Sequence, residues 1–490
     1  MINNHIWSKI SSRERAYASF SSFVRMAIVL LVATGNGILL PSIISKVLPL
    51  IDKIGINSRS VDLVIWVTLV GILISALILL LRLNELATTA VIAINIVVDS
   101  YLNLFFVSLI LALVILLILF LGRSSRYPWV APRALWLWAL FLVLAIFPAT
   151  QTIIPFDGIQ YYLNDFLAAF IIFWLGTEIA RDITRVRYLF GLLAVFGAFV
   201  AIVTIIQAIT GVMLFSRSSL QDVRSYQLVS DVSRYGAFLI NPDSNACFLA
   251  MLLLIALGLL IEVPSLLRKA FYLILAFLIL LALLFTYSTE GALGALAGIV
   301  TLIVLAGRTR IRIFFLLLIF GVAIVVIVFL PAQVGHLLQH ASDPSELSLR
   351  EGAWQTGIRV IQAFPLTGVG LGGYVYRVRA EPYRVPAQYI VLDHPHNAYL
   401  EFAALAGLPV LIVFLTLLVL FLRLALRNWM QADIRDRPLL GTGVAVVTVL
   451  SFFSLSDAGW TFPPLLALGW LVLGVISSPL LTKSRNSQAT

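Results

Sequence analysis

Charge and cysteine are both scarce in this chain. Only 11% of its 490 residues are charged, whereas a soluble domain of average composition has about 25%. The single cysteine, Cys247, excludes an intramolecular disulfide framework. The sequence contains no Walker, Rossmann or CxxC pattern, so it gives no support to nucleotide hydrolysis or thiol redox chemistry. These absences argue against a soluble enzyme that depends on nucleotides or disulfides.

Long apolar runs fill the sequence instead, and 61% of the residues are hydrophobic. Many runs reach the roughly 20 residues that a helix needs to cross a bilayer. The pattern predicts an all-α, polytopic membrane protein with about 12–14 transmembrane helices. The candidate spans lie at 23–48, 61–81, 84–100, 101–121, 134–150, 163–180, 188–213, 245–262, 270–288, 290–306, 312–331, 397–423, 439–456 and 463–481.

The net charge of +10 is distributed unevenly among the loops. Basic short loops alternate with nearly neutral ones, which is the pattern of the positive-inside rule and places both termini in the cytoplasm. The first apolar run is too long for a cleavable signal peptide, so none is expected. Nucleic acid is not needed to explain the charge. The basic groups are Arg123, Arg126, Arg133; Arg181, Arg185, Arg187; Arg268, Lys269; Arg308, Arg310, Arg312; and Arg423, Arg427, Arg435, Arg437.

The same topology places four segments on the outer face: 214–244, Ser288–Gly291, 332–396 and Ser456–Trp460. The two long ones contain arginine and no lysine. Arginine has a planar fork that matches phosphate oxygens, so this bias predicts a phosphate-bearing ligand. The alternative is that the arginines pair with the acids of the same loops. The arginines are Arg217, Arg224, Arg234, Arg350, Arg359, Arg377, Arg379 and Arg384.

The longest outer segment contains two recognisable local patterns. Residues 348–361 have the apolar spacing of an amphipathic helix. The residues on or near its apolar face are Leu349, Ala353, Trp354, Ile358 and Ile361. We expect this helix to lie on the membrane surface, with Trp354 at headgroup level and Arg350 directed toward the site. Residues 368–373 are rich in glycine and lack the strand and helix of a nucleotide loop, so they predict a turn.

Two of the five histidines lie in Asp393-His394-Pro395-His396-Asn397, at the entrance to an apolar run. A histidine there can exchange protons close to a lipid-borne substrate. Asn397 suits either an orienting role or a helix N-cap. Glu401, one helical turn later, is positioned to orient His396 or Asn397.

A metal site is a weaker interpretation of this segment. Asp393, His394 and His396 are all possible ligands, but a His-Pro-His spacing hinders both rings from reaching one ion. A serine hydrolase is not supported, since no nucleophile-elbow pattern is present. We therefore expect no metal at the site.

Several motifs together resemble the O-antigen ligase family, which shares a core domain with O-antigen and exopolysaccharide polymerases. His396-Asn397 followed after nine residues by Gly407 is similar to its signature. The segments 234–245, 350–354 and 365–372 resemble three further family motifs, and the resemblance covers roughly 190–425. One position departs from the pattern: Glu290 stands where the family usually has arginine.

The resemblance implies a C-type glycosyltransferase (GT-C) fold with N-terminal helices in 1–187, a family core in 188–425 with periplasmic loops 214–244 and 332–396, and C-terminal helices in 426–490. It implies a multi-pass protein of the bacterial inner membrane, with its active site on the periplasmic face. The donor would be a glycan linked to undecaprenyl diphosphate, and the acceptor lipid A-core or a growing glycan. No cofactor is expected, because the diphosphate is already a good leaving group.

Within that mechanism, His396 is the catalytic base and Arg350 and Arg234 bind the diphosphate. The orienting or acceptor-binding residues are Asn397, Glu401, His394 and Glu290. Direct attack by the acceptor would invert the anomeric carbon. Ligase, polymerase, another glycan transferase and a transporter of lipid-linked glycan stay open as alternatives; charge is scarce within the spans, which disfavours transport.

Overall fold

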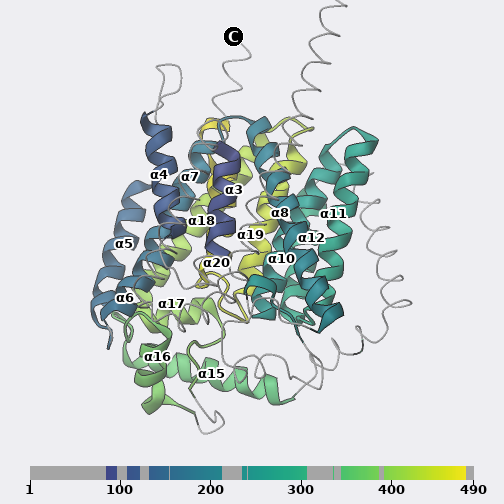
Figure 1. Ribbon diagram of the computed structural model, residues 1–490. Helices are drawn as coiled ribbons and strands as arrows, with labels where there is room; N and C mark the ends of the chain where they lie inside the picture. Colours follow the sequence, from purple (N-terminus) through teal and green to yellow (C-terminus); the bar gives the residue numbers. More distant parts are fainter. Residues whose placement is uncertain are drawn as a thin grey trace, which may run out of the picture. The chain divides into compact units, whose positions relative to one another are not determined.

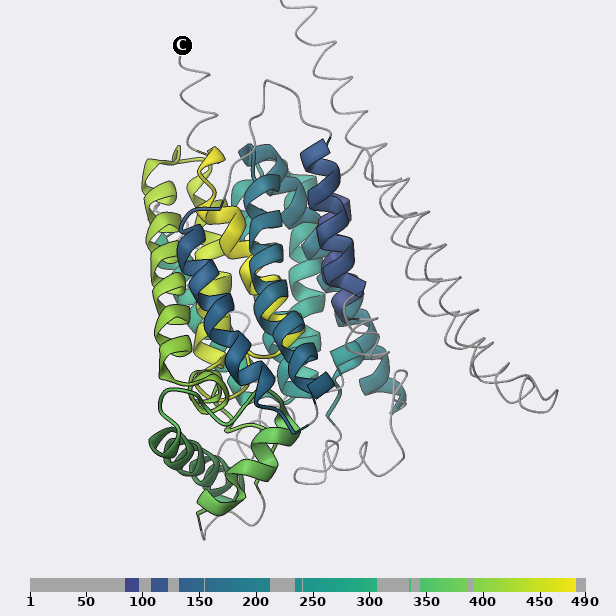
Figure 2. The same ribbon diagram turned by 90° about the vertical axis from the view of Figure 1, so that its left-hand side faces the viewer.

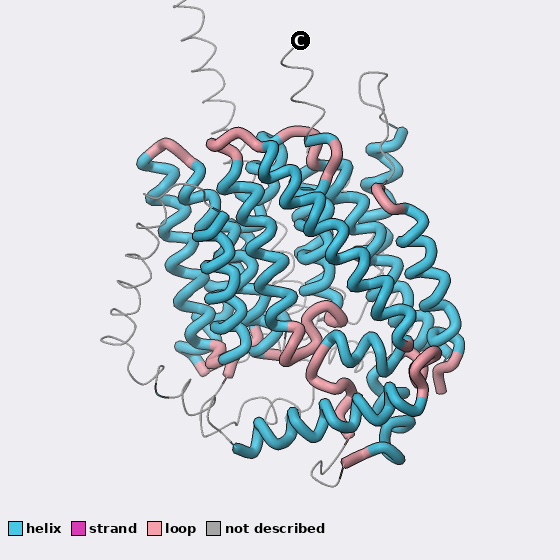
Figure 3. The backbone as a smooth tube through the Cα atoms, turned by 180° about the vertical axis from the view of Figure 1, so that it is seen from behind, coloured by secondary structure: helices cyan, strands magenta, loops and turns pink. Residues whose placement is uncertain are grey.

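The computed structural model describes residues 84–96, 107–121, 132–153, 155–211, 234–239, 241–305, 335, 344–385 and 391–481. The chain divides into two compact units, 1–79 and 80–490, and the described residues all belong to the second. This part contains helices and loops and no strand (Figure 3). The predicted spans at 23–48, 61–81 and 312–331 lie outside the described residues.

The described helices follow the predicted apolar runs closely. Each of the remaining predicted spans coincides with a helix or a pair of helices (Figure 1). The helices are α3 (Asn84–Ile94), α4 (Val107–Leu121), α5 (Leu135–Thr150), α6 (Pro155–Tyr161), the π-helix η2 (Tyr162–Leu167), α7 (Ala168–Ile179), α8 (Ile183–Thr210), η3 (Ala237–Leu239), α10 (Pro242–Glu262), α11 (Leu266–Phe285), α12 (Thr289–Leu305), α15 (Pro344–Ala363), α16 (Gly373–Ala380), η4 (Glu381–Tyr383), α17 (Ala398–Ala406), α18 (Leu408–Gln431), α19 (Arg437–Phe453) and α20 (Pro463–Ser477).

Five of the described helical segments are long and apolar enough to cross a bilayer: 157–179, α8, α10, α11 and α18. They differ in how they are covered. Almost all of α10 is buried, whereas α11 and α18 leave large apolar side chains exposed, such as Phe277 (59%) and Val419 (63%). Apolar surface of this kind is unfavourable in water and suits contact with lipid. The chain is therefore a multi-pass membrane protein.

Close helix contacts hold the bundle together. α10 packs against α8, α11, α12 and α19, and α20 packs against α7, α18 and α19. Glycine permits the approach of α7 to α20: a Cβ on Gly176 would lie 2.4 Å from the Leu471 carbonyl oxygen, and one on Gly474 would lie 2.2 Å from the Phe173 carbonyl oxygen. Helices in membranes commonly associate through such small residues. These contacts fix the positions of the loops at both ends.

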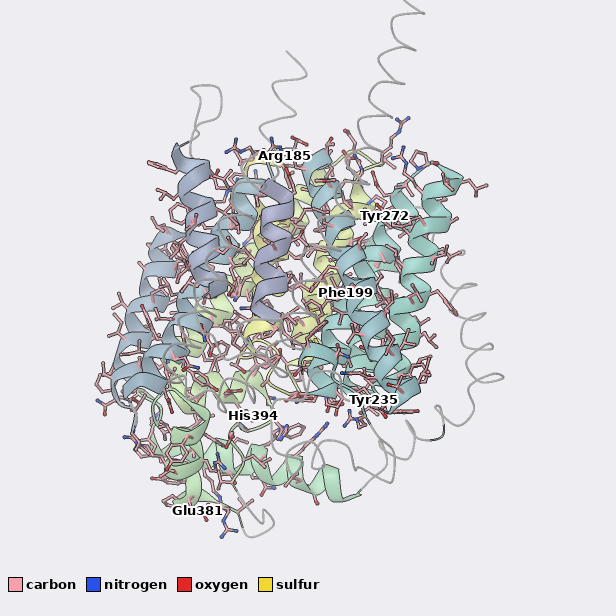
Figure 4. The ribbon with its side chains drawn as sticks, viewed as in Figure 1. Arg185, Phe199, Tyr235, Tyr272, Glu381 and His394 are labelled. Atoms are coloured by element: carbon pink, nitrogen blue, oxygen red, sulfur yellow. The ribbon has the colours of Figure 1, made fainter. Side chains whose placement is uncertain are left out.

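The loops at the two ends of this unit differ in character. One end contains the basic connections from α7 to α8 and from α18 to α19, and Arg185 marks it in Figure 4. His394 and Tyr235 lie at the opposite end. The helices α15 and α16 also lie beyond the bundle at that end, in both views (Figures 1 and 2). The histidine segment, Tyr235 and the helices α15 and α16 of the long outer segment thus lie at one end of the bundle.

The predicted span at 397–423 is wrong in one respect, because it is two helices. α17 ends at Ala406 and α18 begins at Leu408; Gly407 between them has a φ of 89°, a conformation that favours glycine. A Cβ on Gly407 would lie 2.4 Å from the Leu366 carbonyl oxygen, and the Leu408 amide donates to the Pro365 carbonyl. The chain before α16 therefore inserts beside the break.

The glycine-rich segment 368–373 is a turn, as predicted. Gly368, Gly370 and Gly372 all have positive φ. The amides of Val369 and Gly370 donate to α17 carbonyls at 2.9 and 3.0 Å. This turn consequently fixes the C-terminal end of α17, the helix that follows the histidines.

The predicted amphipathic helix 348–361 is confirmed as part of α15, but its buried face differs from the predicted one. Ala353 of the predicted face is buried, but Ile358 of that face is 44% exposed, and Thr356 and Val360, which were not assigned to it, are buried. The reason is tertiary: α15 packs across α17 rather than lying only on a membrane surface. Small and β-branched side chains fit that crossing.

Candidate functional site

His396 lies in the loop before α17, in a backbone conformation that is rare for a non-glycine residue. Its φ is +48°, in the left-handed region. Its amide donates to Nδ1 of His394 at 3.2 Å, and its carbonyl accepts a hydrogen bond from Nε1 of Trp354 at 2.9 Å. Strained backbone of this kind persists only where surrounding contacts determine it. The backbone amide and carbonyl of His396 are therefore each fixed by a side chain, those of His394 and Trp354.

Asp457 faces the ring of His396 from the loop between α19 and α20. Its Oδ1 lies 3.6 Å from Nδ1 of His396, close enough for an ion pair and longer than a normal hydrogen bond. Burial by itself would raise the pKa of Asp457, but the two histidine rings and the Ala458 amide lower this pKa to about 2. An ionised Asp457 beside Nδ1 leaves Nε2 of His396 as the nitrogen that can accept a proton.

His394 lies against His396, with their ring centroids 4.3 Å apart. Burial, and then the neighbouring His396 ring, lower the pKa of His394 to about 4. At neutral pH its ring is therefore uncharged, which is consistent with Nδ1 accepting the His396 amide. His394 acts here as a support for the His396 backbone.

The expectation that a His-Pro-His spacing keeps the two rings from one ion is wrong. The ligand atoms of His394, His396 and Asp457 all lie within 4.8 Å of one another. The left-handed conformation at His396 turns the chain back, and Asp457 comes from a distant part of the sequence. Two imidazoles and a carboxylate are a set that can hold a divalent ion. The same positions are also suitable for a metal-free site in which Asp457 orients the ring of His396.

Arg234 is buried at the same end of the bundle, just before α10. It forms an ion pair with Asp243, and its Nε donates to the Thr286 carbonyl at 3.0 Å. The segment is shaped by local hydrogen bonds: Asn241 caps α10 by accepting from the Asp243 amide at 2.8 Å. Only 5% of Arg234 is exposed.

Arg350 in α15 forms an ion pair with Glu290, the residue that departs from the family pattern. Glu290 is the second residue of α12 and also accepts a hydrogen bond from Ser288 at 3.2 Å. The Arg350 side chain retains 19% of its exposure, more than Glu290 with 5%. Both predicted phosphate-binding arginines are thus paired with carboxylates. Arg234 pairs with an acid of its own outer loop, as the alternative interpretation expected, whereas Arg350 pairs with an acid of a different outer segment.

Other arginines of the long outer segment also have protein partners. Arg377 pairs with Asp393 at 2.8 Å, and Arg384 pairs with Glu381 at 2.9 Å. Both pairs are about half-exposed. Arg377 belongs to α16, and Glu381 begins η4. Arg217 and Arg224 lie outside the described residues.

Asn397 is the N-cap of α17. Its Oδ1 accepts from the amides of Tyr399 and Leu400, both at 3.0 Å, and its Nδ2 donates to the Leu455 carbonyl at 2.9 Å. The Ala398 amide also donates to the carbonyls of the 454–457 loop. Asn397 therefore ties α17 to the loop that contains Asp457.

Glu401 points toward a different partner from those expected. Its Oε2 accepts a hydrogen bond from the Thr461 hydroxyl at 2.7 Å, and only 2% of the residue is exposed. Burial is the main reason that the pKa of Glu401 is raised to about 8. The hydrogen bonds described for Glu401 thus connect it with the 454–462 loop rather than with His396 or Asn397.

The separate pieces meet in one polar cluster. Trp354 binds the His396 carbonyl from the same helix as Arg350, four residues later. Asp243 interacts electrostatically with both Glu290 and Asp457. The structure therefore brings together His396, His394, Asp457, Arg234 and Arg350. Glu401 and Asn397 lie behind them and connect with the Asp457 loop.

The sequence pattern indicated no role for Asp457 and placed Trp354 at the headgroups. Asp457 was within reach, since it is the one acid in Ser456–Trp460, a segment already placed on the outer face. Its contact with His396 depends on a separation of 61 residues, which no local pattern reveals. Trp354 differs from expectation because α15 crosses α17 and brings the indole to the histidine loop.

Comparisons with known proteins agree with the motif resemblance. A comparison with curated proteins gives no match. Residues 274–415 match the family model described as O-antigen ligase, a stretch that includes Glu290, Arg350, His396 and α17. The matched stretch thus contains the histidine signature and one of the two arginines. Residues 274–415 of this membrane protein are therefore a domain of the O-antigen ligase family.

Proposed function

We propose that the chain transfers a glycan from undecaprenyl diphosphate to a sugar hydroxyl at the periplasmic face of the bacterial inner membrane. The observation that carries this proposal is the cluster of a histidine–aspartate pair and two arginines at one end of the bundle. The basic loops at the other end support a cytoplasmic location for that end. The family domain supports lipid-linked glycan as the substrate class.

His396 is the general base in this mechanism. Nε2 of His396 takes the proton of the acceptor hydroxyl while the hydroxyl oxygen attacks the anomeric carbon. The bond from that carbon to the phosphate oxygen breaks, and its electron pair leaves with the lipid diphosphate. Asp457 stabilises the imidazolium that forms, from its position beside Nδ1. Attack opposite the leaving group inverts the anomeric carbon.

Arg350 and Arg234 hold the diphosphate as its negative charge increases. Arg350 has the more accessible side chain, and α15 connects it with the His396 carbonyl through Trp354. Arg234 is buried beside Asp243 and contributes fixed positive charge at the α10 and α12 N-termini. These helix ends favour an anion in addition. No metal is required in this proposal, because the arginines neutralise the diphosphate.

The acceptor distinguishes the remaining alternatives. A ligase passes the finished glycan to lipid A-core, and this is the assignment we favour. A polymerase extends a glycan on its own carrier, in O-antigen or exopolysaccharide synthesis. We propose a GT-C arrangement in either case.

A gene deletion read by a polysaccharide gel tests the proposal. Loss of polymer from lipid A-core, with long carrier-linked chains retained, identifies a ligase. Single repeat units on the acceptor identify a polymerase. An unchanged glycan profile would refute glycan transfer at this site. Complementation by the wild-type gene and failure of His396→Ala to complement complete the test.

A further inference from the structure

A small cavity lies behind the histidine cluster, between η2, α17 and the loop that follows α19. Its volume is about 10 Å³, close to the space of one water molecule. Tyr161, Asp165 and Thr461 contribute its polar groups, and Phe402 of α17 is one of its apolar walls. A cavity that combines polar groups with this size suits a single ordered water.

Asp165 lines this cavity and has an oxygen without a hydrogen-bond partner among the described residues. This oxygen is Oδ1, and the residue is 4% exposed. It lies within η2, a π-helical turn in an otherwise α-helical segment. π-Helical turns occur often at functional sites. A buried carboxylate oxygen without a donor is costly, which points to a bound proton, water or cation.

Glu401 lies on the other side of Thr461, which lines the cavity. Its described hydrogen bond is the one from the Thr461 hydroxyl, at 2.7 Å. The groups that face Glu401 electrostatically are acids: Asp165 in η2 and Asp457 in the 454–462 loop, with the phenols Tyr161 and Tyr376 beyond them. Among the described residues, neither Asp165 nor Glu401 has a basic partner at ion-pair distance.

Two neighbouring buried carboxyls without a basic partner are unfavourable as two anions, and the Thr461 hydroxyl donates only to Glu401 among the contacts described. We propose that Asp165 and Glu401 form a proton-binding pair that holds one proton, with a water in the cavity that Asp165 and Thr461 line. The raised pKa of Glu401 supports a proton at this place at neutral pH. The bound proton is distinct from the one that His396 takes from the acceptor.

The Asp165–Glu401 pair is connected with the candidate catalytic residues through the 454–462 loop. Thr461 belongs to the same loop as Asp457, and Glu401 interacts electrostatically with Asp457. Loss of the bound proton would add a second anion behind Asp457 and disturb the loop that orients His396. The two carboxyls are therefore positioning residues. This effect on transfer rests on the proposed function, whereas proton binding itself does not.

Infrared difference spectroscopy of the full-length purified protein tests proton binding directly. Wild type should show the carbonyl band of a neutral carboxylic acid at pH 7, and the band should disappear on titration above about pH 8. Both Asp165→Asn and Glu401→Gln should remove or shift it, because each variant changes one member of the pair. Glu381→Gln, which alters an exposed carboxyl, should leave the band unchanged. Absence of the band in wild type, or its persistence in both variants, would overturn the proposal.

The pH profile of transfer tests the positioning role. Wild-type transfer should fall as the pH rises through about 8, and Glu401→Gln should remove this alkaline loss, because an amide keeps the neutral form. An alkaline loss identical in the variant would overturn the coupling. Sodium ions that change the band at fixed pH would indicate a bound metal cation instead of a proton and likewise overturn it. A carboxylic-acid band without any glycan transfer would contradict only the proposed function.

Discussion

Glu290 and Arg350 form an ion pair between α12 and α15, at the position where the resemblance predicts an arginine. Glu290 is buried, so its charge acts on Arg350 with little screening by water. The pair joins the long outer segment to the membrane bundle. It also neutralises one of the two cations assigned to the donor, so a diphosphate must compete with Glu290 for the guanidinium.

Glu290→Gln should therefore strengthen donor binding. The amide keeps a similar shape and removes the competing charge, so we expect the KM for the lipid-linked donor to fall about tenfold with little change in kcat. Steady-state kinetics in proteoliposomes measure both constants. Glu381→Gln is the matched control, since Glu381 pairs with Arg384 away from the cluster. A raised KM in Glu290→Gln would mean that Glu290 aids donor binding.

Arg350→Lys should weaken transfer even though it retains the charge. Lysine lacks the fork that makes two parallel hydrogen bonds to phosphate, which corresponds to a loss of about 10- to 100-fold in kcat/KM. Arg384→Lys provides a control on a half-exposed pair of the same outer segment. Equal activity of Arg350→Lys and wild type would rule out a bidentate phosphate contact.

His396→Ala should abolish transfer, with a loss of at least about 10²–10⁴-fold. Expression and donor binding should stay intact, because the arginines are unaffected. His394→Asn should cost less, since an amide oxygen can still accept the His396 amide hydrogen bond. Glycan transfer by purified variants in proteoliposomes measures the ranking. The opposite ranking would assign the base to His394.

Trp354→Phe tests the contact between α15 and the histidine loop. The change keeps an aromatic ring and removes the hydrogen bond to the His396 carbonyl, which should cost about 0.5–1.5 kcal/mol of stability. The looser loop should lower kcat more than it raises the KM for the donor. Thermal unfolding and kinetics together check this. A variant with wild-type kcat would show that the hydrogen bond has no part in positioning His396.

Acidification should destabilise the protein partly through His394. Its pKa is about 4 when folded and 6.5 in its ordinary state, so the unfolded chain binds more protons between these values. The stability that this ring contributes is present above pH 6.5 and is lost as the pH falls toward 4. The loss should reach about 1–2 kcal/mol, since the ring is partly exposed. Melting temperatures across that window should fall less in His394→Asn, and parallel curves would contradict the assignment.

The sequence by itself determined the membrane-spanning character of the chain and the helical segments from 84 onward. Apolar runs of about 20 residues have few alternatives to a helix in a bilayer, because lipid offers no hydrogen bonds to the backbone. The motifs around Arg350 and His396 likewise indicated the family before any contact was known. The match of 274–415 confirms that resemblance. The break at Gly407 was harder to see, since proline and glycine can be tolerated within such helices.

Only the tertiary structure decided which side chains face one another. The Asp457–His396 contact and the Glu290–Arg350 pair join residues 61 and 60 positions apart, and no periodicity encodes such separations. The same is true of the neighbouring carboxyls Asp165 and Glu401, where η2 meets α17. Pairings of this kind depend on how helices cross, and that depends on packing summed over the whole bundle. The sequence supplied the chemical groups, and the fold decided their partners.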